Sequence, residues 1–146
     1  ETVFEALIKP EQIQRWFASR SSVVPVVGGL YDIGWGDKYG LLKILEIVPN
    51  DKLKLSWPDP QRETILTWTL EGSGGRTRVT LVHSGFAPDE NTDGLHYGWL
   101  NFMGWLKSLC EYGAHWQPPI LKLPAGLEHI YPASINAAQN ELIVIP

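Results

Sequence analysis

The chain has 146 residues, 44% of them hydrophobic and 19% charged, with a formal net charge of −4 at pH 7. This composition is typical of one globular domain with a substantial core, and the lack of a basic block argues against a nucleic-acid partner. The sequence contains no apolar run long enough for a membrane span and no signal-peptide pattern. The single cysteine, Cys110, fits a reducing compartment, so we expect a cytoplasmic protein.

Two short helices are expected first, within residues 2–17. Pro10 separates them, because proline ends one helix and suits the first turn of the next. Ile13, Trp16 and Phe17 recur at the spacing of a buried helical face. Residues 21–29 contain a proline and a glycine pair, and we interpret them as a connection.

Five strands are expected next, because polar and apolar residues alternate in five segments: 30–35, 41–48, 52–57, 63–71 and 76–84. Turn signals separate several of them, namely "PND" at 49–51, "PDP" at 58–60 and "GSGG" at 72–75. Segment 41–48 is partly apolar on both faces, so its inward face is ambiguous. The spacing predicts an antiparallel meander.

A long helix is predicted from about residue 95 to residue 112, with Gly113 as its C-terminal cap. Gly98 and Gly104 are poor helix formers, and we expect close approach of another surface to compensate for them. Residues 114–146 are rich in proline and end in "ELIVIP". We therefore expect one domain over residues 1–113, followed by an extended tail packed on that domain or on a partner subunit.

Several segments in this order resemble one known family: "VFEALIKPEQIQRWF", "YDI", "LEIVPNDKLKLSW", "GRTRVTLVHSGF" and "GWLNFMGWLKSLCEY". They are similar to the family of homologues of the activator of heat-shock-protein-90 ATPase, within the START and birch-pollen-allergen superfamily. The resemblance covers about residues 2–112. It implies an α+β helix-grip fold, in which a curved antiparallel sheet wraps around a long C-terminal helix and leaves a cavity between them.

The family pattern begins with a strand before the first helix, and that strand is missing here. Its absence leaves one sheet edge open, and an unpaired edge invites pairing with another chain. Residues 140–145, "NELIVI", have strand character and could occupy that place in their own chain or in a partner. A homodimer through the tail or the open edge is therefore one expectation.

The resemblance also implies a small hydrophobic ligand, since superfamily members bind lipids, sterols, hormones or polyketides. Small-molecule sites are mostly apolar with few polar anchors, and seven tryptophans in 146 residues suggest flat apolar walls. The alternative is that these rings fill the core and leave no cavity. The residues that we predict to line the cavity are Tyr31, Ile33, Trp35, Leu55, Trp57, Leu66, Trp68, Leu81, His83, Trp99, Phe102, Met103 and Leu106.

His83 ends the inward-facing series of segment 76–84, and three roles compete for it. A metal site would need companions, and the sequence holds no metal-binding His or Cys spacing, so we expect neither metal nor cofactor. A general base would need a partner and a substrate. A polar group in the cavity wall needs only a hydrogen-bond partner, and we favour that role.

The sequence thus favours a ligand-binding protein without chemistry of its own. A cyclase-like or aromatase-like enzyme is the first alternative, with His83 and Tyr31 as weak candidates for carrying protons. A protein-interaction module of the co-chaperone kind is the second alternative.

Overall fold

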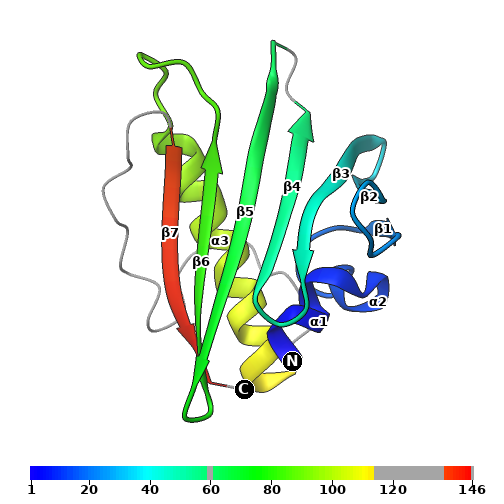
Figure 1. The fold of residues 1–146 in the computed structure, drawn as a ribbon, viewed down its shortest axis with the longest axis vertical. Coiled ribbons are helices and arrows are strands. Elements are labelled where there is room, and N and C mark those ends of the chain that lie inside the picture. Colours follow the sequence, from blue (N-terminus) through cyan, green and yellow to red (C-terminus); the bar gives the residue numbers. More distant parts are fainter. Residues whose placement is uncertain (59–60, 114–136, 146) are drawn as a thin grey trace.

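The computed structural model describes residues 1–58, 61–113 and 137–145. Three helices and seven strands make up this part of the chain (Figure 1). The helices are α1 (Thr2–Ile8), α2 (Pro10–Ile13) and α3 (Asp93–Tyr112). The strands are β1 (Arg20–Val23), β2 (Leu30–Trp35), β3 (Lys38–Val48), β4 (Lys52–Pro58), β5 (Glu63–Ser73), β6 (Arg76–Ser84) and β7 (Ala137–Val144).

The strands form one antiparallel sheet whose order, β1 to β7, is the order of the chain. The alternation seen in the sequence is preserved, since every second residue is buried from Thr64 to Leu70 in β5 and from Val79 to His83 in β6. A register shift between Ile44 and Glu46 changes which residues of β3 face inward, so that Ile47 rather than Glu46 packs against the core. Leu42 and Ile44 point into the core before this bulge, whereas Leu41 and Leu45 are exposed.

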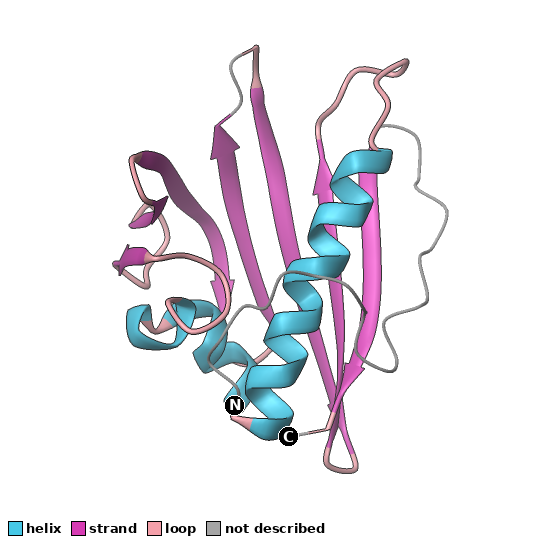
Figure 2. Cartoon of the chain, turned by 180° about the vertical axis from the view of Figure 1, so that it is seen from behind, coloured by secondary structure: helices cyan, strands magenta, loops and turns pink. Residues whose placement is uncertain are grey.

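The sheet curves around α3, which lies across one face of it (Figure 2). This is the α+β helix-grip arrangement predicted from the resemblance. The core between helix and sheet includes Leu53, Leu66, Val79, Leu81 and Leu106. Gly113 ends α3 in the left-handed conformation with φ of 69°, as the sequence predicted. No helix in the described ranges is long and apolar enough to cross a membrane.

The two N-terminal helices meet at Pro10 and close one end of the core. Val3, Phe4 and Leu7 of α1 are buried. The indole N–H of Trp16 donates a hydrogen bond to the carbonyl oxygen of Ala6 at 2.8 Å, so the chain after α2 folds back onto α1. Burial of the large Trp16 ring is possible because its one polar group has this partner.

The sequence predicted five strands, and the structure adds β1 and β7. Strand β1 overlaps the stretch 21–29 that we interpreted as a connection, and that interpretation was wrong for residues 21–23. It is short, and no residue in it is fully buried, so its alternation is weak. Strand β7 covers the edge of β6 in its own chain. The predicted strand character is therefore confirmed for residues 140–144. Residues 114–136 of the predicted tail lie outside the described residues.

Strand β7 is fastened to both ends of α3. Near the start of the helix, Asn140 donates to the carbonyl oxygen of His96 at 2.8 Å and accepts from the His96 ring at 3.0 Å. Near its end, the Lys107 ammonium donates to the carbonyl oxygen of Ile143 at 2.6 Å. Glu111 accepts from the backbone N–H of Ile145 at 2.8 Å. The last strand thus holds the helix against the sheet at two points.

Candidate functional site

A cavity of about 420 Å³ lies between the N-terminal half of α3 and the sheet. Strands β2, β4 and β6 each contribute one side chain to its wall, and α3 contributes the rest. Five rings dominate this wall, four of them from tryptophan or phenylalanine. The lining residues are Trp35, Trp57, His83, Gly94, Leu95, Gly98, Trp99 and Phe102.

Five of the thirteen residues predicted to line a cavity do so: Trp35, Trp57, His83, Trp99 and Phe102. The other eight are buried in the closed core: Tyr31, Ile33, Leu55, Leu66, Trp68, Leu81, Met103 and Leu106. Alternation along a strand shows which face points inward, but not where along that face the helix stands away from the sheet. The structure places the open space toward the start of α3 and packs the remainder tightly.

The sequence analysis missed three lining residues, all in the first turns of α3: Gly94, Leu95 and Gly98. We expected Gly98 to allow close approach of another surface, and this prediction was wrong. Within the part of the chain that the structure describes, a Cβ atom built on Gly98 or Gly94 meets no atom within 4 Å. The spacing of four residues between the two glycines was the available signal, because it places both on one helical face.

His83 is 2% exposed, and both nitrogens of its ring have hydrogen-bond partners. The indole N–H of Trp99 donates to Nδ1 at 3.1 Å, and Nε2 lies 2.7 Å from the hydroxyl oxygen of Thr64. An indole N–H only donates, so Nδ1 is the acceptor and the ring proton is on Nε2. The imidazole in this arrangement is neutral, and its place in the cavity wall is fixed from two sides.

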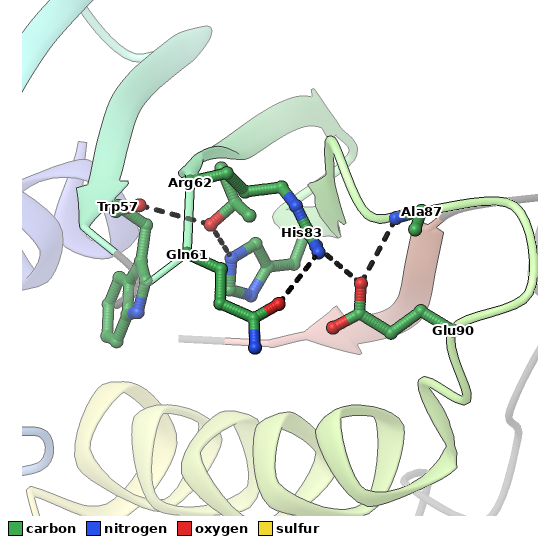
Figure 3. Close-up of polar contacts among 7 residues, drawn as sticks. Trp57, Gln61, Arg62, His83, Ala87 and Glu90 are labelled. Atoms are coloured by element: carbon green, nitrogen blue, oxygen red, sulfur yellow. Dashed lines mark hydrogen bonds and ion pairs between the residues drawn. The ribbon is translucent and has the colours of Figure 1, made fainter.

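The hydrogen bonds continue from the ring into the backbone. The Thr64 hydroxyl accepts from Nε2 of His83 and donates to the carbonyl oxygen of Trp57 at 3.1 Å. Figure 3 shows this sequence of contacts from His83 to Trp57. Each polar group in it is therefore satisfied, which a buried network requires. The arrangement links β6, β5 and β4 at the place where the cavity opens.

An ion pair lies next to this network. Arg62, just before β5, pairs with Glu90 in the loop between β6 and α3. Glu90 also accepts from the backbone N–H of Ala87 at 3.1 Å, as Figure 3 shows. Both side chains are partly exposed, so the pair contributes little to stability. It connects the loop that precedes α3 to the start of β5, an interior strand of the sheet.

The aromatic residues of the wall pack against one another in edge-to-face and tilted contacts. The ring centroids of Trp57 and Trp99 are 5.4 Å apart, with an interplanar angle of 78°. Phe102 packs against Trp99 at 5.8 Å and against Trp35 at 6.3 Å. Such contacts hold the rings in fixed orientations. Trp35, Trp57 and Trp99 therefore line the cavity, whereas Trp16 and Trp68 are buried in the core.

Tyr31, the second candidate proton carrier, is separate from the cavity. It is 1% exposed, and its hydroxyl donates to the carbonyl oxygen of Leu7 at 2.7 Å. Burial raises the pKa of this phenol above its ordinary value of 10.0. The structure therefore does not bring Tyr31 and His83 together at one site.

Among the residues that the structure describes, no group of three or more His, Cys, Asp or Glu side chains could hold an ion. The thiol of Cys110 is partly buried, and burial raises its pKa to about 12. A thiol with so high a pKa carries little thiolate near neutral pH and is a poor nucleophile.

Solved structures of related proteins share this fold. Protein MLL2253 from Mesorhizobium loti is 27% identical with a TM-score of 0.66, over 75% of this chain and 86% of that one. DynU16, from the dynemicin biosynthetic locus, is 25% identical with a TM-score of 0.67, and the match covers 77% of this chain but 43% of DynU16. The Aha1 dimer from Colwellia psychrerythraea has a TM-score of 0.67 over 77% of this chain and 88% of that one; at 22% identity this likeness concerns the fold alone.

Among curated proteins no sequence matches the chain. The family comparison is more informative. The family model described as "Activator of Hsp90 ATPase homolog 1-like protein" matches residues 1–111, from α1 to the last turn of α3. This match covers most of the chain and every residue that lines the cavity. The chain belongs to the Activator of Hsp90 ATPase homolog 1-like family.

Proposed function

We propose that this protein binds a small, largely apolar molecule in the cavity between the start of α3 and the sheet. The observation that carries the proposal is the cavity itself, about 420 Å³ in volume and lined mostly by aromatic rings. Small-molecule sites are typically concave, apolar and about 300–1,000 Å³ in volume. Membership of a superfamily that contains ligand-binding proteins supports the same conclusion.

The test uses N-phenyl-1-naphthylamine, an uncharged probe that fluoresces in apolar surroundings. We expect saturable binding to the purified protein, with quenching of tryptophan fluorescence. Leu95→Glu places a charge in the cavity wall and should abolish binding. Tyr97→Glu is the matched control, because Tyr97 is on the same helix but 62% exposed. The proposal would be contradicted if the probe did not bind the wild type, or if it bound Leu95→Glu as tightly as Tyr97→Glu.

Native mass spectrometry of protein purified without denaturation complements this titration. A co-purified small molecule would identify the class of ligand, and the same spectrum counts subunits. We expect the molecule to be missing from Leu95→Glu and present on Tyr97→Glu.

A second candidate function is an enzyme of the cyclase kind that uses His83. One observation favours it: among the eight described residues that line the cavity, only His83 has an ionisable side chain. Against it, both ring nitrogens are already hydrogen-bonded to Trp99 and Thr64. An enzyme would convert the bound molecule to a product of different structure or mass with the wild type but not with His83→Gln. A binding protein would return it unchanged from both.

A homodimer and a cytoplasmic location stay predictions. Exposed apolar side chains around the β1–β2 connection and on β3 favour self-association, namely Val24, Val26, Val27, Leu30 and Leu41. Sedimentation of the wild type and of the double variant Val27→Ser, Leu41→Ser would test this. We expect a dimer that the double variant weakens, and a wild type that is monomeric at all concentrations would exclude it.

A further inference from the structure

The start of α3 presents bare backbone to the cavity. Gly94 and Gly98 both line it, and they lie one helical turn apart on the same face. A Cβ atom at either position would meet no atom of the described residues within 4 Å. We call this surface, formed by Gly94 and Gly98, the glycine strip.

Packing within the protein does not explain the glycine strip. Glycine weakens a helix because it loses much conformational freedom on folding. It is usually required where φ is positive or where another backbone comes close, and neither condition holds here. What the missing side chains provide is space, and that space belongs to the cavity.

We propose that the glycine strip is the surface on which the ligand lies and that it selects a flat, uncharged ring system. This inference rests on the proposed function. A helical face without side chains is smooth and lets a molecule approach the backbone closely. The surrounding rings of Trp57, Trp99 and Phe102 offer edges and faces to an aromatic ligand, which gains more from them than a saturated one does.

The wall also argues for a neutral ligand. None of the eight described residues that line the cavity carries a permanent charge. The imidazole of His83 is neutral in the observed hydrogen-bond network. A charged ligand would lose its hydration without gaining a partner of opposite sign. The ligand is therefore expected to carry at most neutral polar groups.

Three matched compounds test shape and charge by competition with N-phenyl-1-naphthylamine at pH 7. The compound 2-naphthol is flat and neutral, decahydro-2-naphthol has the same skeleton but is puckered, and 2-naphthoate is flat but charged. We expect 2-naphthol to bind at least tenfold more tightly than either of the others. Equal or tighter binding of the puckered or the charged compound would overturn the inference.

Two variants test the strip itself. Gly98→Leu should weaken binding of 2-naphthol at least tenfold. Gly98→Ala should weaken it less while raising the melting temperature, because alanine favours the helix and meets open space. If Gly98 had a purely structural role, Gly98→Ala would not lower the affinity for 2-naphthol while raising the melting temperature. Tyr97→Leu is the control, since this exposed residue is outside the lining.

The outcomes separate this inference from the proposed function. If Leu95→Glu abolishes probe binding but Gly98→Leu and Gly98→Ala bind 2-naphthol as the wild type does, the strip inference is wrong and the proposed function stands. If the wild type binds no probe at all, both are wrong. Circular dichroism shows whether Gly98→Leu is folded. If Gly98→Leu does not fold, the affinity and melting temperature of Gly98→Ala still test the inference.

Discussion

The indole N–H of Trp99 donates a hydrogen bond to Nδ1 of His83 at 3.1 Å. This contact joins α3 to β6 within the wall of the cavity, and it fixes which nitrogen of the ring is protonated. One polar contact therefore positions two of the lining side chains. The contribution of this hydrogen bond to stability can be tested by substitution of Trp99.

Trp99→Phe should destabilise the protein by about 1–3 kcal/mol, because it removes a donor from the buried Nδ1 of His83 as well as some apolar surface. Urea unfolding measures this change in the free energy of unfolding. Trp105→Phe is the matched control on the same helix, since the structure gives the Trp105 indole N–H no hydrogen bond among the described residues. An equal loss in both variants would mean that the contact with His83 adds nothing.

Asn140→Leu should cost about 1–3 kcal/mol, because it leaves the buried ring N–H of His96 without its acceptor. Thermal and urea unfolding both report the loss. Glu141→Gln changes the next residue of β7 and removes only its partly exposed ion pair with Arg78. We expect the control to lose less than about 1 kcal/mol. A larger loss in the control than in Asn140→Leu would count against the role of Asn140 as a fastening between β7 and α3.

Gly98→Ala and Gly113→Ala should change stability in opposite directions, although an added Cβ meets open space at both positions. Alanine at Gly98 should stabilise the helix by about 1 kcal/mol. At Gly113 the φ angle is 69°, which a residue with a Cβ adopts at a cost of about 1 kcal/mol. Differential scanning calorimetry of the two variants gives the sign of each change. The same sign in both would be inconsistent with the backbone geometry described here.

Deletion of residues 137–146 should remove much of the stability rather than simply dissociate subunits. The deletion exposes core contacts of Leu142 and Val144, each worth about 1.5–3 kcal/mol of burial. It also removes the hydrogen bonds of Asn140. We expect the melting temperature to fall sharply, as measured by circular dichroism. A truncated protein that melts like the wild type would show that β7 is dispensable.

Alkaline pH should destabilise the protein through Cys110. Burial raises the pKa of this thiol from 9.0 to about 12, so the folded state holds its proton more tightly than the unfolded state. The corresponding stability is complete below pH 9 and decreases as the pH rises from 9 toward 12. Urea unfolding at pH 8 and pH 10.5 should show the decrease, and Cys110→Ala should reduce it. An identical decrease in the variant would assign the effect to other groups.

Much of the fold could be predicted because its signals are local. The alternation of β5 and β6 and the helical spacing of Trp99, Met103 and Leu106 each follow from which side chains must avoid water. The bulge in β3 could not be predicted, because it is set by pairing with β4 rather than by the residues of β3 alone. Strand β1 was missed for a similar reason: its four residues gain their structure from β2.

The cavity was harder to predict than the fold. Inward-facing residues such as Leu66 and Trp57 look alike in the sequence, yet one is in the closed core and the other lines open space. The difference depends on where α3 stands away from the sheet, which is a property of the assembled domain. The glycines at positions 94 and 98 were the part of the sequence that marked this place, since side chains are absent there.

The order of strands in the sheet has a consequence for synthesis on the ribosome. Strands β1 to β6 each pair with the neighbour that directly precedes or follows them in the chain, so they can join as hairpins while translation continues. Strand β7 must wait until α3 and the residues after it have emerged. Until then the nascent chain presents the bare edge of β6, and we expect this interval to be when a molecular chaperone would protect it from aggregation.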